Sequence, residues 1–194
     1  MKYDPAKHHR RSIRLPGYDY TTPGAYFVTI CVQDRECLLG KIVDGEMELS
    51  DYGRITTETW QWLGDHHPFV SHDAWVVMPN HIHGIIMIEP DTPSGGPAAV
   101  GAVHEPPLRE SLPQSPTHPG KRKPLGRLVA AFKTVSTNRI NQVRGTPGLP
   151  FWQRNYYEHI IRDEADLDHI REYIVSNPQK WELDQLYPDN PSKW

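Results

Sequence analysis

The sequence predicts an α+β domain built on one antiparallel β-sheet, and three features lead to this prediction. A β-rich run at 26–32 is apolar enough to be a buried central strand. Two further apolar runs, at 72–78 and 81–88, are separated by a proline–asparagine pair that ends the first of them. Apolar residues at helical spacing follow at 125–143. Elements in this order form a layer of helices on a sheet.

The segment between the first two of these strands predicts a hairpin and a helix. Residues 37–48 read as a hairpin with an Asp-Gly turn at 44–45. Ser50 or Asp51 then caps a helix that ends near Asp65, because apolar and aromatic residues recur there at helical spacing.

The last part of the chain predicts a fourth strand and a final helix. The strand lies within 151–161 and is strongest at 156–161. The helix begins at Asp163 with an acidic first turn that suits the helix dipole. It ends near Asn177, which precedes a proline. The full order matches a ferredoxin-like antiparallel sheet with helices on one face, plus this C-terminal helix.

We expect residues 1–194 to form a single domain with two irregular parts. Residues 1–22 are basic and aromatic without clear periodicity, and read as an arm. In the segment 89–123, 12 of 35 residues are Pro or Gly, which predicts a flexible insertion. The segments on either side of it are too small to fold alone.

The composition favours a bacterial-type cytoplasmic protein. The longest apolar runs fall short of the roughly 18 residues that a membrane span needs, and an apolar signal segment is lacking at Met1. Cys31 and Cys37 are expected to be buried free thiols in a reducing compartment, with a disulfide or a metal role as the alternative.

Positive charge is concentrated although the net charge is −3. Between Ser111 and Tyr157 there is no Asp or Glu, and a second basic cluster lies at 7–14. The distribution predicts a basic face for a polyanion and association with the nucleoid, while a solvated surface without a partner is the alternative. The basic residues of the longer stretch are Lys121, Arg122, Lys123, Arg127, Lys133, Arg139, Arg144 and Arg154.

His81 and His83 are candidate metal ligands. Side chains at positions i and i+2 of a strand point to one face, so both imidazoles can reach a single cation. Two histidines leave coordination positions for a third ligand and a phosphate oxygen, as metal-assisted phosphoryl transfer requires. The alternative is a pair of hydrogen-bonded or exposed histidines.

Tyr173 and Asn177 are the second candidate pair. At positions i and i+4 they share one side of the final helix, at the edge of its apolar stripe. A tyrosine there could attack phosphorus and form a phosphotyrosine, and the carboxamide of Asn177 could ligate the metal. An amphipathic boundary tyrosine and a helix C-cap are the structural alternatives. Tyr156 and Tyr157 remain alternative nucleophiles.

Taken together, these segments resemble the REP-associated tyrosine transposases, which are single-tyrosine HUH transposases. The metal motif is 77–86, in which Ile82 stands between the two histidines. In order and spacing the matches span nearly the whole chain except the insertion. The other matching segments are 10–15, 24–29, 132–133, 152–162 and 172–178.

The resemblance implies a ferredoxin-like fold, a Mg²⁺ or Mn²⁺ cofactor, and cleavage and rejoining of single-stranded DNA near hairpins through a 5′-phosphotyrosine. His81, His83 and Asn177 would then hold the metal, and Tyr173 would be the nucleophile. Expected partners are single-stranded or hairpin DNA, without a membrane, and the protein would be a monomer or a homodimer. A domesticated hairpin-binding protein without turnover and an RNA-processing enzyme are the alternative functions.

The expected DNA contacts come from the arm and from the basic stretch. Arginines can bind phosphates and base edges, and Tyr18 and Tyr20 of the arm offer stacking surfaces. The DNA-binding candidates are Arg10, Arg11, Arg14, Arg127, Lys133 and Arg154. Glu158, His159 and Arg162 could border the active site, or could be structural.

Overall fold

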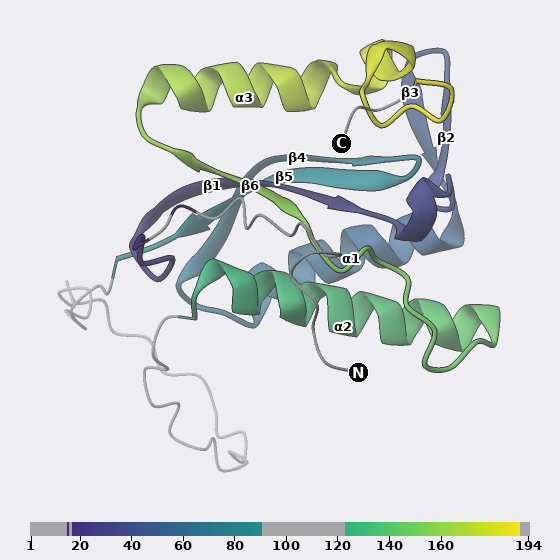
Figure 1. Ribbon diagram of the computed structural model, residues 1–194, viewed down its shortest axis with the longest axis horizontal. Coiled ribbons are helices and arrows are strands. Elements are labelled where there is room, and N and C mark those ends of the chain that lie inside the picture. The colour runs from purple at the N-terminus through teal and green to yellow at the C-terminus, as the bar shows by residue number, and fades with distance from the viewer. Residues whose placement is uncertain (1–14, 16, 91–122, 191–194) are drawn as a thin grey trace, which may run out of the picture.

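The structure, a computed structural model, describes Leu15, residues 17–90 and residues 123–190 (Figure 1). Its centre is a four-stranded antiparallel sheet in the order β4-β5-β1-β6, which is the predicted ferredoxin-like arrangement. The two inner strands, β5 and β1, pair along their whole length. The strands are β1 (Gly24–Cys31), β4 (Val70–Met78), β5 (His81–Ile88) and β6 (Tyr157–Ile161).

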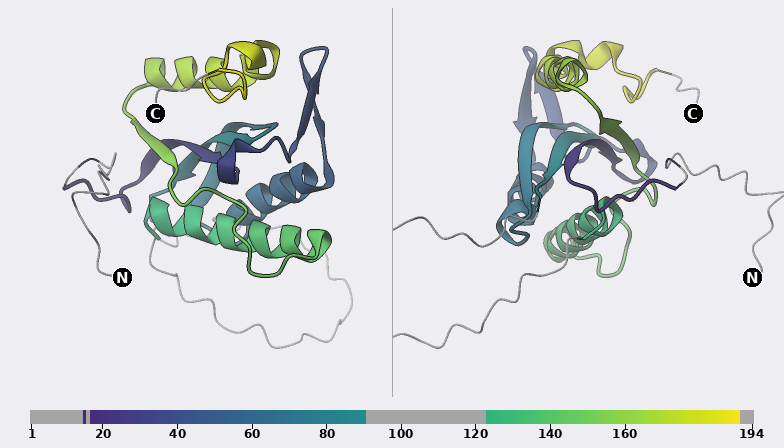
Figure 2. Two further views of the ribbon diagram at one scale, coloured as in Figure 1. Left: turned by 45° about the vertical axis from the view of Figure 1, so that its right-hand side comes forward. Right: turned by 90° about the vertical axis from the view of Figure 1, so that its left-hand side faces the viewer.

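Helices cover both faces of this sheet. The helices α1 (Asp51–Asp65) and α2 (Leu125–Arg144) lie on one face, and α3 (Glu164–Ser176) lies alone on the other (Figures 1 and 2). Side chains alternate along β1: Tyr26 and Val28 belong to the large core beneath α1 and α2, while Phe27 belongs to a smaller core beneath α3. Because β1 is buried on both faces, its sequence is a continuous apolar run and does not alternate with polar residues.

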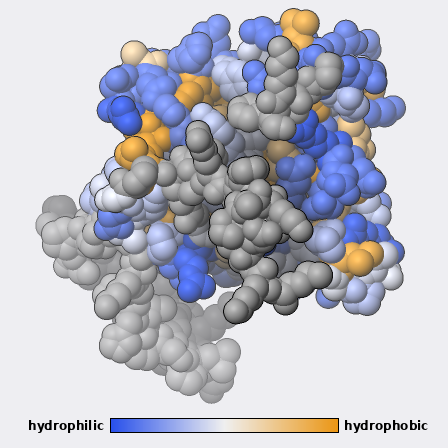
Figure 3. Space-filling model, viewed as in Figure 1, coloured by the Kyte–Doolittle hydropathy of each residue, from blue (hydrophilic) through white to orange (hydrophobic). Residues whose placement is uncertain are grey.

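Side chains at the predicted positions cap the helices. The hydroxyl of Ser50 accepts a hydrogen bond from the amide N–H of Gly53 at the start of α1. The carboxylate of Asp163 does the same for the N–H of Asp166 at the start of α3. The outer side of α3 is mainly hydrophilic (Figure 3), which agrees with a helix that buries one stripe.

Arg139, whose place in the apolar stripe of α2 the periodicity does not explain, links α2 to α1. Its guanidinium is paired with Glu58 and donates a hydrogen bond of 3.3 Å to the hydroxyl of Thr59. The residue is therefore half-buried between two helices, and its charge is satisfied at the rim of their contact.

The predicted hairpin forms a separate two-stranded sheet of β2 (Gly40–Val43) and β3 (Glu46–Leu49). Its turn has Asp44 and Gly45 at φ values of 51° and 80°, the left-handed region that an Asp-Gly pair supplies most easily. The turn packs on Gln179, just beyond α3.

The fourth strand, β6, lies in the predicted segment, at its strongest part. Before β6, the segment 151–156 joins the sheet only through a bridge between Val32 and Trp152. The ammonium group of Lys133 binds the carbonyl oxygens of residues 153 to 155, at 2.8, 3.4 and 2.9 Å. These carbonyl oxygens accept hydrogen bonds from a side chain instead of from a neighbouring strand, and strand pairing begins only at Tyr157.

Several sequence predictions fall on parts of the chain outside the described residues, including the arm up to position 14 and nearly all of the insertion. Within the described ranges, no helix is long and apolar enough to span a membrane. Both cysteines are free, but Cys37 is exposed and Cys31 only half-buried, so the prediction that both thiols are buried was wrong for Cys37. Cys37 follows the short 3₁₀ turn after β1, outside the paired strands.

Gly84 in β5 leaves room for the indole of Trp60. A Cβ at position 84 would lie 2.4 Å from Cζ2 of that ring. We expect Gly84→Ala to lower the free energy of unfolding by about 1–3 kcal/mol through overpacking. The loss should be smaller in a Trp60→Phe background, where the ring is shorter. Urea unfolding of the wild type, the two single variants and the double variant measures both losses. Equal losses in both backgrounds would contradict this packing.

His72 in β4 is buried against Trp60, with ring centroids 5.0 Å apart. Burial lowers the pKa of His72 to about 4, although the charge of Asp65 acts in the opposite direction. The unfolded chain, with a histidine pKa near 6.5, therefore binds more protons between pH 6.5 and 4, and stability falls as the pH falls through that window.

We expect His72→Phe to reduce this acid-dependent loss of stability by about 2 kcal/mol. Urea unfolding at several pH values gives the two curves of stability against pH. If the curves for the wild type and the variant run parallel between pH 6.5 and 4, the proposed neutral state of His72 is wrong.

Candidate active site

His81 and His83 meet on the face of the sheet that α3 covers. Both side chains are buried, and their Nε2 atoms are 2.9 Å apart. The alternation of β5 places them on one face, as the sequence predicts, while Ile82 points into the core on the other face.

The other ring nitrogen of each histidine is held by a neighbouring side chain. Nδ1 of His81 lies 2.8 Å from Oδ1 of Asn80, and Nδ1 of His83 lies 2.8 Å from the hydroxyl of Thr29. If each Nδ1 carries the proton, both Nε2 atoms present lone pairs to the same point. Two facing lone pairs at this distance require a proton or a cation between them.

Burial keeps both imidazoles neutral. It lowers the pKa of His81 well below the ordinary value, and the charge of His83 adds to this effect. It also lowers the pKa of His83, although the carboxylate of Asp184, 4.0 Å from Nε2 of His83, opposes the change. A neutral imidazole is the form that ligates metals.

Tyr173 of α3 reaches this pair from above the sheet. Its hydroxyl oxygen lies 3.1 Å from Nε2 of His83 and 3.5 Å from Oδ2 of Asp184. The ring packs edge-on against Phe27, and 41% of the residue remains exposed. Burial raises the pKa of the phenol to about 12, and the charge of Asp184 adds to it, so the phenol is protonated in this state.

Asp184 is the site residue that the sequence analysis missed. It follows the 3₁₀ helix Pro178–Leu183, which continues directly from α3. One carboxylate oxygen of Asp184 and one ring nitrogen from each of His81 and His83 lie within 4.8 Å of one another. A single acidic residue beyond a helix stop carries no periodic or motif signal, so only the folded chain reveals it.

The carboxylate of Asp184 is stabilised as an anion. Burial raises its pKa, but the neighbouring imidazoles of His83 and His81 and the amide N–H of Leu186 together bring the pKa below its usual value. The Leu186 N–H donates at 2.6 Å to Oδ1, which leaves Oδ2 facing the histidines.

Asn177 lies at the site but also contacts Asp184. Its Nδ2 donates a hydrogen bond of 3.2 Å to Oδ2 of Asp184. Its Oδ1 is buried and has no hydrogen-bond partner among the described residues. A buried carbonyl oxygen without a partner is unfavourable, and a cation ligand would satisfy it.

The segment after α3 closes the site on the side of His81. The indole of Trp181 lies 6.0 Å from the ring of His81. The Nδ2 of Asn80 donates to the carbonyl oxygen of Leu186 at 2.8 Å and to that of Arg35 at 3.1 Å. Asn80 therefore orients His81 and also anchors the segment that carries Asp184.

The other predicted site residues are dispersed. His159 of β6 is bonded to Asp166 at 2.8 Å on the α3 face, and Arg162 is exposed after β6. Glu158 pairs opposite Val28, which turns its buried side chain toward the α1–α2 face, away from the histidines. Tyr157 is exposed, with its ring 6.1 Å from that of Phe27, and it pairs opposite Thr29.

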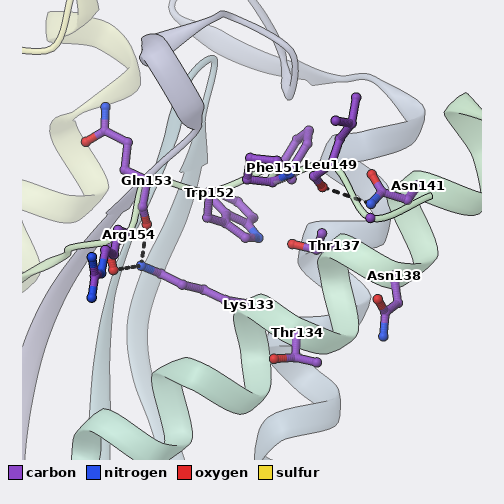
Figure 4. A pocket seen from close by; sticks show the side chains of 12 residues that line it. Lys133, Thr134, Thr137, Asn138, Asn141, Leu149, Phe151, Trp152, Gln153 and Arg154 are labelled. Carbon is purple, nitrogen blue, oxygen red and sulfur yellow. Dashed lines mark hydrogen bonds between the residues drawn. The ribbon is translucent and has the colours of Figure 1, made fainter. Parts of the chain in front are cut away.

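The predicted DNA contacts divide into three groups. Arg127 and Arg154 are exposed, whereas burial lowers the pKa of Lys133 to about 8 and its ammonium group is bound to backbone carbonyls. Lys133 and Arg154 line a cleft of about 380 Å³ between α2 and the segment before β6 (Figure 4). Tyr18 and Tyr20 pack on the core, and the arginines of the arm lie outside the described residues.

Two known proteins are similar to the chain in sequence. The chain is 42% identical, over 97% of its length and 98% of the relative, to an uncharacterized protein of Haemophilus influenzae. It is 27% identical, over 89% of its length and 80% of the relative, to an H. influenzae protein provisionally named REP-associated tyrosine transposase. No family model matches the chain.

A solved structure shares the fold. It is a REP-associated tyrosine transposase bound to a REP hairpin, with a TM-score of 0.54, 19% sequence identity, and coverage of 91% of this chain and 77% of that one. The chain is thus similar in sequence to one protein with this name and in fold to another.

Metal titration can show whether Asp184 or Asn177 is the third protein ligand beside the two histidines. We expect Asp184→Ala to weaken Mn²⁺ binding at least 10-fold, because an ionised carboxylate is a stronger ligand than a carboxamide. Asn177→Ala should weaken it less. Asp189→Ala, which removes an exposed carboxylate from the same segment, is the control. Isothermal titration calorimetry measures the Mn²⁺ affinity of the three variants and the wild type. If Asn177→Ala weakens binding more than Asp184→Ala does, Asn177 is the third ligand instead.

Proposed function

We propose that the chain is a metal-dependent single-stranded DNA endonuclease and strand transferase that acts near hairpins through a phosphotyrosine on Tyr173. The observation that carries this proposal is the position of the Tyr173 hydroxyl, 3.1 Å from Nε2 of His83. A nucleophile and a metal ligand at this separation can both contact one phosphate group.

The donor set fits a divalent cation. Two neutral imidazoles face one point together with a carboxylate oxygen, and a buried carboxamide oxygen nearby lacks a partner within the described ranges. His81, His83 and Asp184 would hold the ion, with Asn177 as an additional oxygen ligand. When bound, it would polarise the scissile phosphate and offset its developing charge. Two nitrogen ligands favour Mn²⁺ over Mg²⁺, which prefers oxygen.

The residues of the chain define the bond changes. The Oη atom of Tyr173 attacks phosphorus, the bond from phosphorus to the 3′ oxygen breaks, and a 5′-phosphotyrosine forms. The phenolic proton is lost to water, because Asp184 would stay ionised as a ligand of the ion. The departing 3′ oxygen takes a proton and becomes a hydroxyl. The reverse attack by a 3′ hydroxyl rejoins DNA and releases Tyr173.

The exposure of Tyr173 supports a macromolecular substrate. The site lies under one end of α3 and is open on the side of the tyrosine, where 41% of that residue is accessible. The fold shared with a transposase that is bound to a REP hairpin supports a hairpin as the flanking structure. Arg127 and Arg154, both exposed, would neutralise phosphates, so binding should weaken as salt rises.

The decisive test is a covalent adduct. Wild-type protein, Mn²⁺ and a hairpin with a single-stranded flank should give a protein–DNA band that resists denaturation. We expect Tyr173→Phe to abolish the band and Tyr157→Phe, which alters a neighbouring exposed tyrosine, to retain it. Chelation should stop the reaction, and Mg²⁺ should support it less well than Mn²⁺.

Two results would count against the proposal. An adduct that persists in Tyr173→Phe would move the nucleophile elsewhere. Tight hairpin binding without any cleavage or adduct in the wild type would instead favour a hairpin-binding protein without turnover. Cleavage of an RNA hairpin in preference to the DNA hairpin would change the substrate class.

A further inference from the structure

The helix that carries Tyr173 is fastened by polar contacts to both edge strands of the sheet. On the β4 side, Nε and Nη2 of Arg171 donate hydrogen bonds to the two carboxylate oxygens of Asp73, at 2.8 and 2.7 Å. On the β6 side, Nε2 of His159 lies 2.8 Å from Oδ2 of Asp166. Because β4 and β6 are the outer strands, α3 is held across the full width of the sheet.

The apolar contact beneath α3 is small. The buried cluster between α3 and the sheet has five members, whereas the core beneath α1 and α2 has nineteen. Apolar contacts are not directional, and a narrow apolar stripe lets a helix roll about its axis. The polar contacts to β4 and β6 therefore do much to fix the rotation of α3 about its own axis. The five members are Ala25, Phe27, Ile85, Ile170 and Ile174.

Arg171 and Tyr173 leave α3 on opposite sides. With about 100° per residue, the two positions are about 160° apart around the helix axis, with the stripe of Ile170 and Ile174 between them on the sheet side. Arg171 reaches outward to β4, and Tyr173 reaches inward to His83. Any roll that lengthens one contact also moves the other.

Asp73 lies on the α3 face of β4, at a β-bulge. Pairing with β5 shifts between His72 and Trp75, so that two consecutive residues, Asp73 and Ala74, fall between paired positions. His72 and Trp75 pack toward α1, while Ala74 packs toward α3. Alternation from His72 places Asp73 on the α3 face, and the bulge lets Ala74 share that face while Trp75 returns to the α1 face.

We propose that Asp73 and Arg171 are positioning residues of the cleavage reaction, because their bidentate pair fixes the rotation of α3 and so holds the Tyr173 hydroxyl at the metal ligands. The inference rests on the proposed function. The pair does not touch the histidines, so it acts on the reaction only through the helix. Arg171 must be an arginine for this purpose, because lysine cannot make the two parallel hydrogen bonds.

Asp168 provides a matched control. It also accepts a hydrogen bond of 2.9 Å from Arg171, through Nη1, but it lies three residues earlier on α3 itself. Asp168→Ala therefore removes a carboxylate from the same guanidinium without detaching the helix from β4. Its effect reports the loss of a surface ion pair alone.

Single-turnover adduct formation with Mn²⁺ and hairpin DNA tests the proposal. We expect Asp73→Ala and Arg171→Lys each to lower the rate constant about 10- to 100-fold at full amplitude, since misplacement by about 1 Å can cost about 100-fold. Asp168→Ala should stay within about twofold of the wild type. The double variant Asp73→Ala/Arg171→Ala should be no slower than the slower single variant, because both remove one contact.

A merely structural role gives a different pattern. Partial unfolding lowers the amplitude of the single turnover and leaves its rate constant unchanged. It also weakens Mn²⁺ and hairpin binding, which the proposal leaves within about twofold. That pattern, or an unchanged rate constant in Arg171→Lys, would overturn the positioning role.

A second measurement is independent of activity. With 3-fluorotyrosine at position 173, the ¹⁹F resonance of the ring reports its contact with His83 and Phe27. We expect the resonance to shift or broaden in Asp73→Ala and Arg171→Lys and to stay in place in Asp168→Ala. An unmoved resonance in all three variants contradicts the clamp. If the wild type forms no adduct, the proposed function fails, and this resonance still decides whether the pair positions Tyr173.

Discussion

The antiparallel register between β1 and β5 is the constraint on which the rest of the structure depends. It sets Thr29 opposite His83 and Cys31 opposite His81, on the face that α3 covers. Side chains alternate with a period of two, so a slip by one residue would turn both histidines into the main core. The apolar residues on the other face of β1 and β5, which include Val28 and Ile82, prevent this slip because they must stay buried.

The two faces of the sheet differ in composition: one carries most of the apolar core, and the other carries the polar cluster. The face beneath α1 and α2 holds the large core, in which Trp60 fills the space left by Gly84. The face beneath α3 has a small core and a cluster of polar groups around His83. Stability is concentrated on one side, and buried polar groups are tolerated on the other because neighbouring side chains hold most of their hydrogen-bonding atoms.

Local sequence patterns predicted most of the fold. The strand runs, the Asp-Gly turn and the capping residues Ser50 and Asp163 all lie where the structure has them. These patterns leave features unexplained where a side chain contacts a distant segment. Lys133 binds the carbonyls that would otherwise extend β6, and Arg139 occupies an apolar position because Glu58 and Thr59 of α1 meet it there.

The sequence by itself determined the elements, the shared face of the two histidines and the exposed edge of Tyr173, because periods of 2 and 3.6 residues are local properties. Only the tertiary structure decided that Asp184 joins His81 and His83, and that Asp73 anchors α3. Asp184 lies beyond the last helix, and Asp73 meets an arginine that is 98 residues further along the chain. Neither placement has a periodic signal, since both depend on which segments the folded chain brings together.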